Sequence, residues 1–186
     1  MDSLNFGGEE TSTSTNYKFQ DTLGEIGTGR ITSTNYAGLI GFRQTESDPK
    51  MTFTISGNTI DFGTLTTSGV SSDSITITTT TNAVDGYVTT IYETENLKTL
   101  GSADIDDVAD GTVSAGSEEY GIITSGAAGQ MNGADTAITT SPQAVALYSS
   151  WVNGSTVTIT FKAAISSTTG AGAYSHAVTL VSTGRF

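Results

Sequence analysis

The sequence predicts an all-β fold: an antiparallel β-sandwich, Ig-like or jelly-roll-like, with an extended N-terminal arm. Threonine and serine supply 35 and 22 of the 186 residues, and threonine suits a half-exposed strand because it is β-branched. The helix formers Lys, Glu, Gln and Leu are scarce, which argues against a helix bundle. Short segments of alternating apolar and polar residues recur, and Gly and Asn turns separate them at intervals of roughly 8 to 12 residues.

Residues 1–50 are the predicted arm, and they repeat a short motif. Thr13-Ser14-Thr15-Asn16-Tyr17 returns as Thr32-Ser33-Thr34-Asn35-Tyr36, and we interpret the two copies as similar extended strands. The apolar residues around them are too many to stay in water and too few to form a core. They are therefore expected to add a strand to a sheet, in the same molecule or in a neighbouring copy. These strand-donation residues are Tyr17, Phe19, Tyr36, Ile40 and Phe42.

Residues 51–186 are the predicted sandwich domain. Met51, Phe53 and Ile55 alternate with threonines, and a turn follows at 56–58. Further strands are expected over 60–62, 75–81, 86–92, 120–123, 145–147, 157–165 and 174–181. A turn is expected at 82–86, and a hairpin at 170–172 joins the last two strands. The inward-facing positions select as core Phe53, Ile55, Phe62, Ile77, Val157, Ile159 and Phe161.

Charge and composition exclude several classes of function. Seven basic against nineteen acidic residues give a net charge of −12, which opposes binding to nucleic acids and to anionic membrane surfaces. The chain has no cysteine and no apolar stretch of membrane-spanning length, so neither disulfides nor membrane insertion is expected. Residues 1–6 do not read as a signal peptide. A Thr, Ser and Gly-rich, Lys-poor composition is nevertheless typical of exported β-proteins, so a secreted or cell-surface location is expected.

An acidic loop is the one candidate metal site. Four carboxylates stand within eight residues, a density of oxygen ligands that suits Ca²⁺. The EF-hand spacing is absent, because Val108 occupies the third ligand position, and a solvated acidic loop is the default explanation of the cluster. Calcium is thus the only cofactor suggested by the sequence, and its candidate ligands are Asp104, Asp106, Asp107 and Asp110.

No constellation of residues predicts an enzyme. Glu93 with Glu95, or Glu118 with Glu119, could supply the two acids of a glycosidase, but no specific motif accompanies either pair. The single histidine, His176, has no Ser-His-Asp signature around it and is expected to be a packed or hydrogen-bonded residue.

An aromatic platform for sugars is the alternative function. Trp151, with Tyr148 and Tyr87 as neighbours, could stack on a carbohydrate, whereas packing in the core or at its rim is the other explanation. The glycosylation sequon that begins at Asn153 falls where a turn between strands is expected. Because Asn-Gly is also a common turn sequence, the sequence leaves open whether Asn153 carries a glycan. Lys162 falls on the outward face of its strand, which disfavours an internal isopeptide bond.

Several segments carry a resemblance to a family. They are 58–65, 81–87 with its Thr-Asn-Ala and Gly-Tyr pairs, 120–122 and the closing 170–181, together with Gly41-Phe42. In these segments the chain resembles predicted secreted surface proteins of uncultured bacteria, which implies a β-sandwich without an established activity. In layout it is more distantly similar to biofilm-fibre and pilus subunits, whose N-terminal arm completes the sheet of the next subunit. The resemblance implies an extracellular structural or interaction protein, a surface-fibre subunit whose main partner is itself, with a surface polysaccharide as the alternative.

Overall fold

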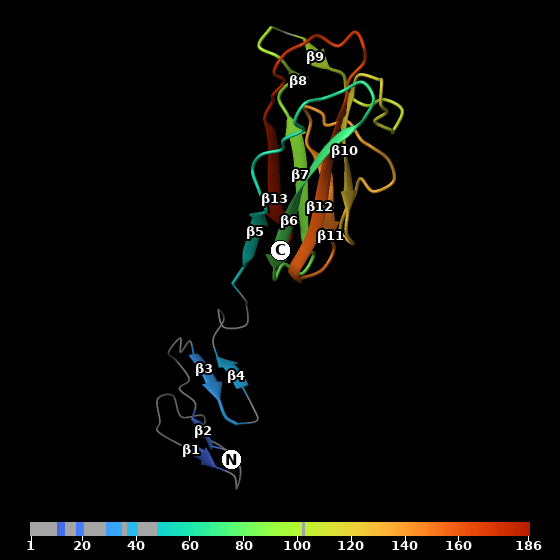
Figure 1. Cartoon of the computed structure of the whole chain (residues 1–186). Coiled ribbons are helices and arrows are strands. Elements are labelled where there is room, and N and C mark those ends of the chain that lie inside the picture. The colour runs from blue at the N-terminus through green and yellow to red at the C-terminus, as the bar shows by residue number, and fades with distance from the viewer. Residues whose placement is uncertain (1–10, 14–17, 21–28, 35–36, 41–47, 102) are drawn as a thin grey trace. The chain divides into compact units, whose positions relative to one another are not determined.

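The computed structural model describes residues 11–13, 18–20, 29–34, 37–40, 48–101 and 103–186 (Figure 1). The chain divides into two compact units, Met1–Asp48 and Pro49–Phe186. Strands, turns and irregular connections account for all of these described residues, and none of them is helical. The protein is therefore all-β, as its threonine-rich alternation predicts.

The described part of the first unit consists of two β-hairpins. β1 (Thr11–Thr13) pairs with β2 (Lys18–Gln20), and β3 (Gly29–Thr32) pairs with β4 (Ala37–Ile40), both antiparallel. The innermost pairs are Thr13 with Lys18 and Thr32 with Ala37, so a copy of Ser-Thr-Asn-Tyr stands between the strands of each hairpin. Of the two motif copies, Thr13 lies in β1 and Thr32 in β3, whereas Ser33 and Thr34 follow the end of β3. Residues 14–17, 35 and 36 lie outside the described residues, so the interpretation of the copies as extended strands stays a prediction.

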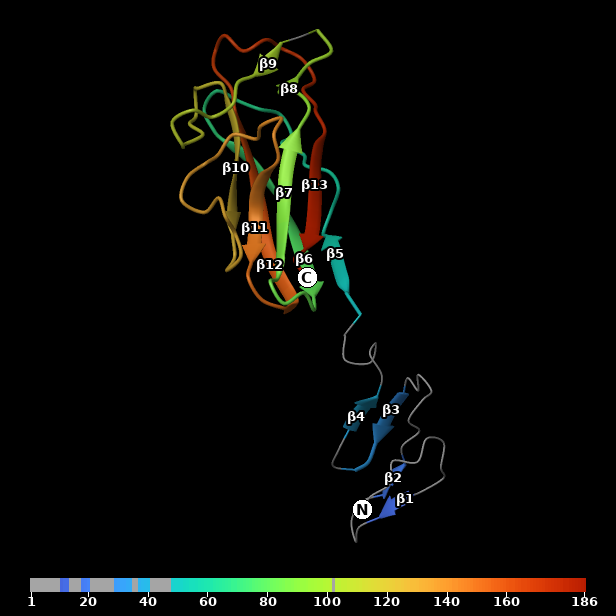
Figure 2. The same ribbon diagram turned by 180° about the vertical axis from the view of Figure 1, so that it is seen from behind.

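The second unit is a sandwich of two antiparallel sheets, which confirms the predicted fold (Figures 1 and 2). The first sheet has the order β10 (Glu119–Ser125), β12 (Val152–Ala164), β6 (Ser71–Thr81) and β5 (Met51–Ile55). The second has the order β11 (Gln143–Tyr148), β7 (Tyr87–Glu93) and β13 (Val178–Gly184). A short pair, β8 (Leu97–Lys98) with β9 (Asp104–Ile105), lies at one end.

The core lies between the two sheets, where alternate residues of the long strands meet. Four predicted core residues are buried: Ile77, Val157, Ile159 and Phe161. Phe53 and Phe62 are only half-buried, although both pack against this core. The prediction that Ile55 lies in the core is wrong, since this residue is 43 % exposed. Ile55 is the last residue of β5, a short edge strand with only one neighbour. Its side chain therefore follows the alternation of core residues but is not fully covered by the opposite sheet.

The connections between strands correct two further expectations. Residues 60–62 form no strand; they belong to an irregular segment between β5 and β6. The predicted terminal hairpin is also wrong, because β13 pairs with β7 in the other sheet. β12 already has β6 on one edge and β10 on the other, so the chain must cross to the opposite sheet after Ala164.

Two glycines with positive φ angles shape the backbone at the end of the sandwich near the C-terminus. Gly86 has φ 74°, and a Cβ there would lie 1.9 Å from the carbonyl oxygen of Tyr148, so only glycine allows the 82–86 turn to pack against the end of β11. Gly154 has φ 80° and lies where the register of β12 shifts between Val152 and Ser155. The sequon at Asn153 is therefore part of a bulge within β12, not a turn between strands.

Candidate functional site

One side of the sandwich is sealed by backbone pairing. Along β11, Gln130 N–H donates to the Val145 carbonyl (3.1 Å), and Leu147 N–H donates to the Ala128 carbonyl (2.9 Å). Along β10, Ile122 and Thr136 exchange two hydrogen bonds of 2.9 and 2.8 Å. Loop segments therefore satisfy the main-chain groups that edge strands leave free.

The opposite side, where the edge strands β5 and β13 lie, is the candidate interface (Figures 1 and 2). We call it the open seam. Among the described residues, no backbone hydrogen bond reaches the outer edge of either strand. The apolar side chains that these two strands direct at the core are only half-buried: Met51, Phe53, Val178 and Leu180.

The register shows which groups of β5 are free. Asn82 N–H donates to the Lys50 carbonyl (3.2 Å), and Ser56 N–H donates to the Thr76 carbonyl (2.9 Å). Because hydrogen-bonded pairs alternate in an antiparallel ladder, Thr52 and Thr54 also bond to β6. The N–H and C=O groups of 51, 53 and 55 point away from β6.

The same argument applies to β13. Arg185 N–H donates to the Gly86 carbonyl (2.8 Å), which places residues 183, 181 and 179 in the hydrogen-bonded pairs with β7. Consistently, Glu93, the partner of Val178, donates its N–H away from β13, to Thr139 (3.1 Å). The main-chain groups of Val178, Leu180 and Ser182 therefore point out of the sheet, at positions suited to an added strand.

The strand-donation residues predicted in the arm fall partly in described segments. Phe19 lies in β2 opposite Ser12, and Ile40 lies in β4 opposite Gly29. Tyr17, Tyr36 and Phe42 lie outside the described residues. Whether the arm pairs within its own molecule or with another copy stays a prediction.

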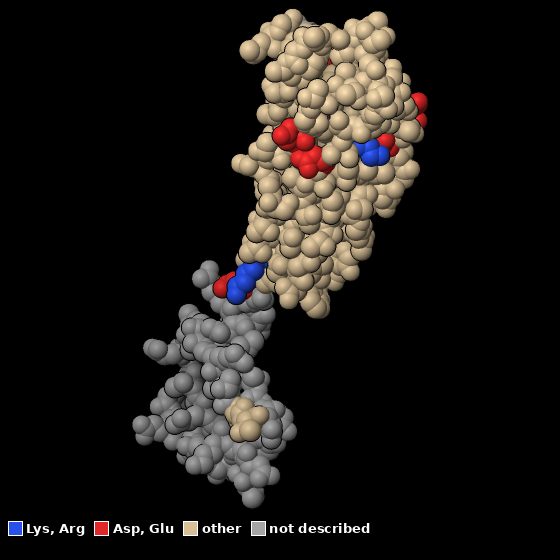
Figure 3. Space-filling model, viewed as in Figure 1, with Lys and Arg blue, Asp and Glu red and all other residues tan. Residues whose placement is uncertain are grey.

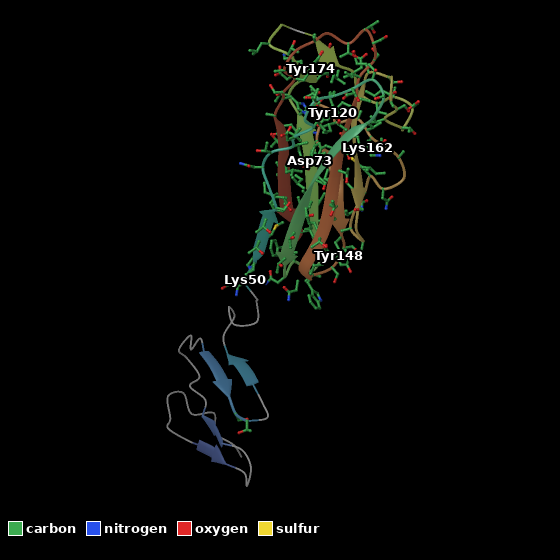
Figure 4. The ribbon with its side chains drawn as sticks, viewed as in Figure 1. Lys50, Asp73, Tyr120, Tyr148, Lys162 and Tyr174 are labelled. Atoms are coloured by element: carbon green, nitrogen blue, oxygen red, sulfur yellow. The ribbon has the colours of Figure 1, made fainter. Side chains whose placement is uncertain are left out.

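A buried polar cluster occupies the end of the sandwich opposite Tyr148 (Figure 4). His176 Nδ1 lies 3.1 Å from the Glu95 carbonyl and 3.1 Å from Glu93 Oε2, while Nε2 lies 3.0 Å from the Tyr120 hydroxyl. A neutral imidazole with its proton on Nδ1 satisfies both bonds, donating to Glu95 and accepting from Tyr120. Glu93 Oε2 and Asp107 Oδ1 are then buried without a hydrogen bond.

Burial decides the protonation of this cluster. It raises the pKa of Glu93 to about 7, and the Asp107 carboxylate adds to that rise. The Asp107 pKa is itself raised by burial and by Asp106, and the Tyr120 pKa is raised by burial and by Glu93. Burial lowers the pKa of His176, against an opposing effect of Glu95. The neutral forms of the acid, the imidazole and the phenol are therefore the ones that the fold favours.

The cluster ties distant segments together. His176 precedes β13, Glu93 ends β7 and Tyr120 lies in β10. The backbone carbonyl of Tyr120 also accepts a hydrogen bond from Val108 N–H (2.8 Å). The prediction that His176 is a hydrogen-bonded residue is confirmed. The burial of Glu93 beside it is not predicted from the sequence, where Glu93 stands out only as a possible partner of Glu95. The missed signal is periodicity, since Tyr87, Thr89, Ile91 and Glu93 share the inward face of β7.

The other carboxylates do not converge on a cleft. Glu95 pairs with Lys98 at the surface, the Glu118 carboxylate accepts from Thr169, and Glu119 accepts from Ser114 N–H (2.8 Å). Lys162, which is predicted on the outward face of its strand, forms an ion pair. Its Nζ lies 2.7 Å from Asp135 Oδ1, a buried carboxylate that also accepts from Val113 N–H.

The acidic loop shows no assembled metal site. Asp104 accepts from the Asn96 amide (3.1 Å), and Asp110 accepts from Thr112 N–H (3.0 Å). Asp106 is exposed, and Asp107 turns toward the buried cluster. In the part of the chain that the structure describes, no three acidic or imidazole groups lie close enough to hold a metal ion. Calcium binding by Asp104, Asp106, Asp107 and Asp110 stays a prediction.

Trp151 is exposed, not packed in the core. Its side chain is 68 % accessible and that of Tyr148 is 39 % accessible, whereas Tyr87 is buried with its hydroxyl 2.9 Å from Ser155 Oγ. Of the predicted aromatic neighbours, Tyr148 thus shares the surface with Trp151 and Tyr87 does not.

Comparisons with known proteins add no assignment. A scan against protein-family models found no matching family, and searches among curated proteins and among solved structures found no similar protein. The resemblance to secreted surface proteins therefore stays a prediction. No helix in the described segments is long and apolar enough to cross a membrane.

Proposed function

We propose that this protein is an extracellular structural or interaction protein whose copies join by strand addition. A strand from the N-terminal arm of one copy pairs with the outer edge of β13 in the next, and repetition of this contact builds a fibre. The composition supports an exported location, since a Thr, Ser and Gly-rich, Lys-poor chain is typical of surface β-proteins.

The observation that carries the proposal is the contrast between the two sides of the sandwich. Loop backbones pair with β10 and β11, but in the described residues nothing pairs with the outer edges of β5 and β13. An added strand would satisfy the free groups of Val178, Leu180 and Ser182, and its side chains would cover the half-buried residues of the open seam. β13 is the favoured acceptor because its sheet has three strands and the facing sheet has four.

The edge strands also lack the usual protection. Natural edge strands are commonly blunted by lysine or proline, yet β5 and β13 contain no charged residue and no proline. In Figure 3 most of the face of the second unit in view is uncharged, apart from an acidic patch and a few separate charged groups. The donor side needs a partner as well, since an isolated two-stranded hairpin such as β1 with β2 is marginally stable in water.

Deleting residues 1–46 tests the proposal. The full chain should form filaments, visible by electron microscopy, whose amount rises with protein concentration. The truncated chain should keep a β-type circular dichroism spectrum, melt at a lower temperature and stay monomeric in sedimentation. Filaments of the truncated chain would refute strand donation, and a truncated chain that does not fold would make the arm an integral strand of its own sandwich.

A further inference from the structure

The loop between β11 and β12 presents the only tryptophan of the chain to solvent. Tyr148 is the last residue of β11 and Trp151 stands directly before β12, so a tight connection holds both aromatic side chains at one end of the sandwich. A side chain of this size normally buries its surface. The exposure of Trp151 is therefore a feature that core packing does not explain.

Two shallow hollows flank Trp151. One, of about 490 Å³, is lined by Tyr148 and Trp151 together with residues 126–127 and 152–156. The other, of about 710 Å³, is lined by Trp151 with residues 49–52 and 80–82. Because Trp151 and Val152 border both hollows, a chain-like ligand that crosses the indole ring can reach both of them.

The lining selects the chemistry of that ligand. The smaller hollow has no charged side chain, and its polar side chains carry the Asn153 amide and the hydroxyls of Tyr148, Ser155 and Thr156. Lys50 is the only charged residue of the larger hollow. Aromatic faces suit the C–H faces of sugar rings, and neutral amides and hydroxyls exchange hydrogen bonds with sugar hydroxyls. The net charge of −12 repels anionic polymers.

We propose that this end of the sandwich binds a neutral polysaccharide, with Trp151 and Tyr148 as the stacking platform. The backbone behind the platform is fixed. Gly154 N–H donates to Thr80 Oγ1 (2.9 Å), and the Ser155 hydroxyl pairs with buried Tyr87. The site is thus largely formed before a ligand arrives, which lowers the entropic cost of binding. The aromatic platform and the smaller hollow contain no residue of β5 or β13, so stacking on the platform does not depend on strand addition. The larger hollow shares Met51 with the open seam.

The fluorescence of the full chain tests the site directly, since Trp151 is its only tryptophan. Titration with neutral hexasaccharides of β-1,4-glucose, β-1,3-glucose and β-1,4-N-acetylglucosamine should shift the emission to the blue with at least one of them, in a saturable manner. Trp151→Ala should weaken binding of that sugar by about tenfold or more in calorimetry, and Trp151→Phe should restore part of it. Leu100→Ala, which removes an exposed apolar side chain elsewhere, is the matched control and should bind normally.

Two results would overturn the proposal. The first is the absence of a saturable change with any of the three neutral hexasaccharides. The second is an emission shift that follows protein concentration without sugar, which would make a second copy of this chain the occupant. Filament formation by Trp151→Ala separates this proposal from strand addition, because the variant should assemble like the unaltered chain.

Discussion

A carboxyl group inside a sandwich is favoured in its neutral form, and Glu93 shows the consequence at the scale of one residue. Its side chain is only 2 % exposed and faces His176, which is itself buried and neutral. Burial disfavours the charged form of the carboxyl group and the Asp107 carboxylate adds to this effect, so the pKa of Glu93 rises to about 7. Protonation of Glu93 therefore favours folding, and this contribution is complete below about pH 4.5 and lost as the pH rises through 7.

Glu93→Gln should remove this pH dependence, because an amide resembles the protonated acid. The variant should match the unaltered protein near pH 5 and exceed its free energy of unfolding at pH 9 by up to roughly 3 kcal/mol. Urea unfolding at pH 5, 7 and 9 measures the difference. Glu95→Gln, which alters an exposed neighbour paired with Lys98, should show no such trend. A Glu93→Gln variant that is less stable at pH 9 would instead indicate an ionised Glu93 paired with a charged His176.

The open seam is a property of strands. β13 alternates side chains toward the core, such as Val178 and Leu180, with side chains on the outer face, such as Val181. The main-chain groups of the core-facing residues are the free ones, so an added strand would extend the sheet in register with the existing core. The seven residues of β13 offer a longer template than the five of β5.

A lysine on each edge strand discriminates between the two acceptors. Val181 and Ile55 are almost equally exposed, at 45 % and 43 %, so Val181→Lys and Ile55→Lys form a matched pair. Val181→Lys should raise the protein concentration needed for assembly by about tenfold, because a charged edge resists pairing. Ile55→Lys should leave assembly unchanged. Light scattering against concentration measures both, and denaturant unfolding checks that each variant folds; the reverse pattern would make β5 the acceptor.

Charge acts on the whole molecule. Copies that each carry −12 repel one another, and this long-range repulsion opposes any assembly that buries uncharged edges. Added salt screens it: the Debye length falls from about 30 Å at 0.01 M to about 8 Å at 0.15 M.

Salt should therefore promote assembly. Raising NaCl over this range should lower the protein concentration at which filaments form, as measured by sedimentation and electron microscopy. The chain without residues 1–46 is the control and should stay monomeric at both salt concentrations. Assembly that weakens with salt would show that ion pairs, not strand pairing, join the copies.

The sequence by itself determined that the protein is a β-sandwich and which residues alternate toward a core. Period-two alternation in β6 and β12 places Ile77, Val157 and Phe161 inside, because a sheet with one covered face buries every second side chain. The exposed aromatic candidate was also visible as a lone tryptophan between two strands. These features depend on residues close together in the chain, because the geometry of a single strand fixes which side chains share a face.

Only the tertiary structure decided which strands are neighbours and which faces are covered. Ile55 and Ile77 have the same local pattern, yet one ends an edge strand and the other is enclosed between sheets. β13 joins β7 rather than β12 because both edges of β12 are occupied. Glu93, Tyr120 and His176 come from three segments far apart in the chain, so no local motif predicts their cluster. The free edges of the open seam also depend on the order of the strands, because an edge strand is one that has a neighbour on one side only.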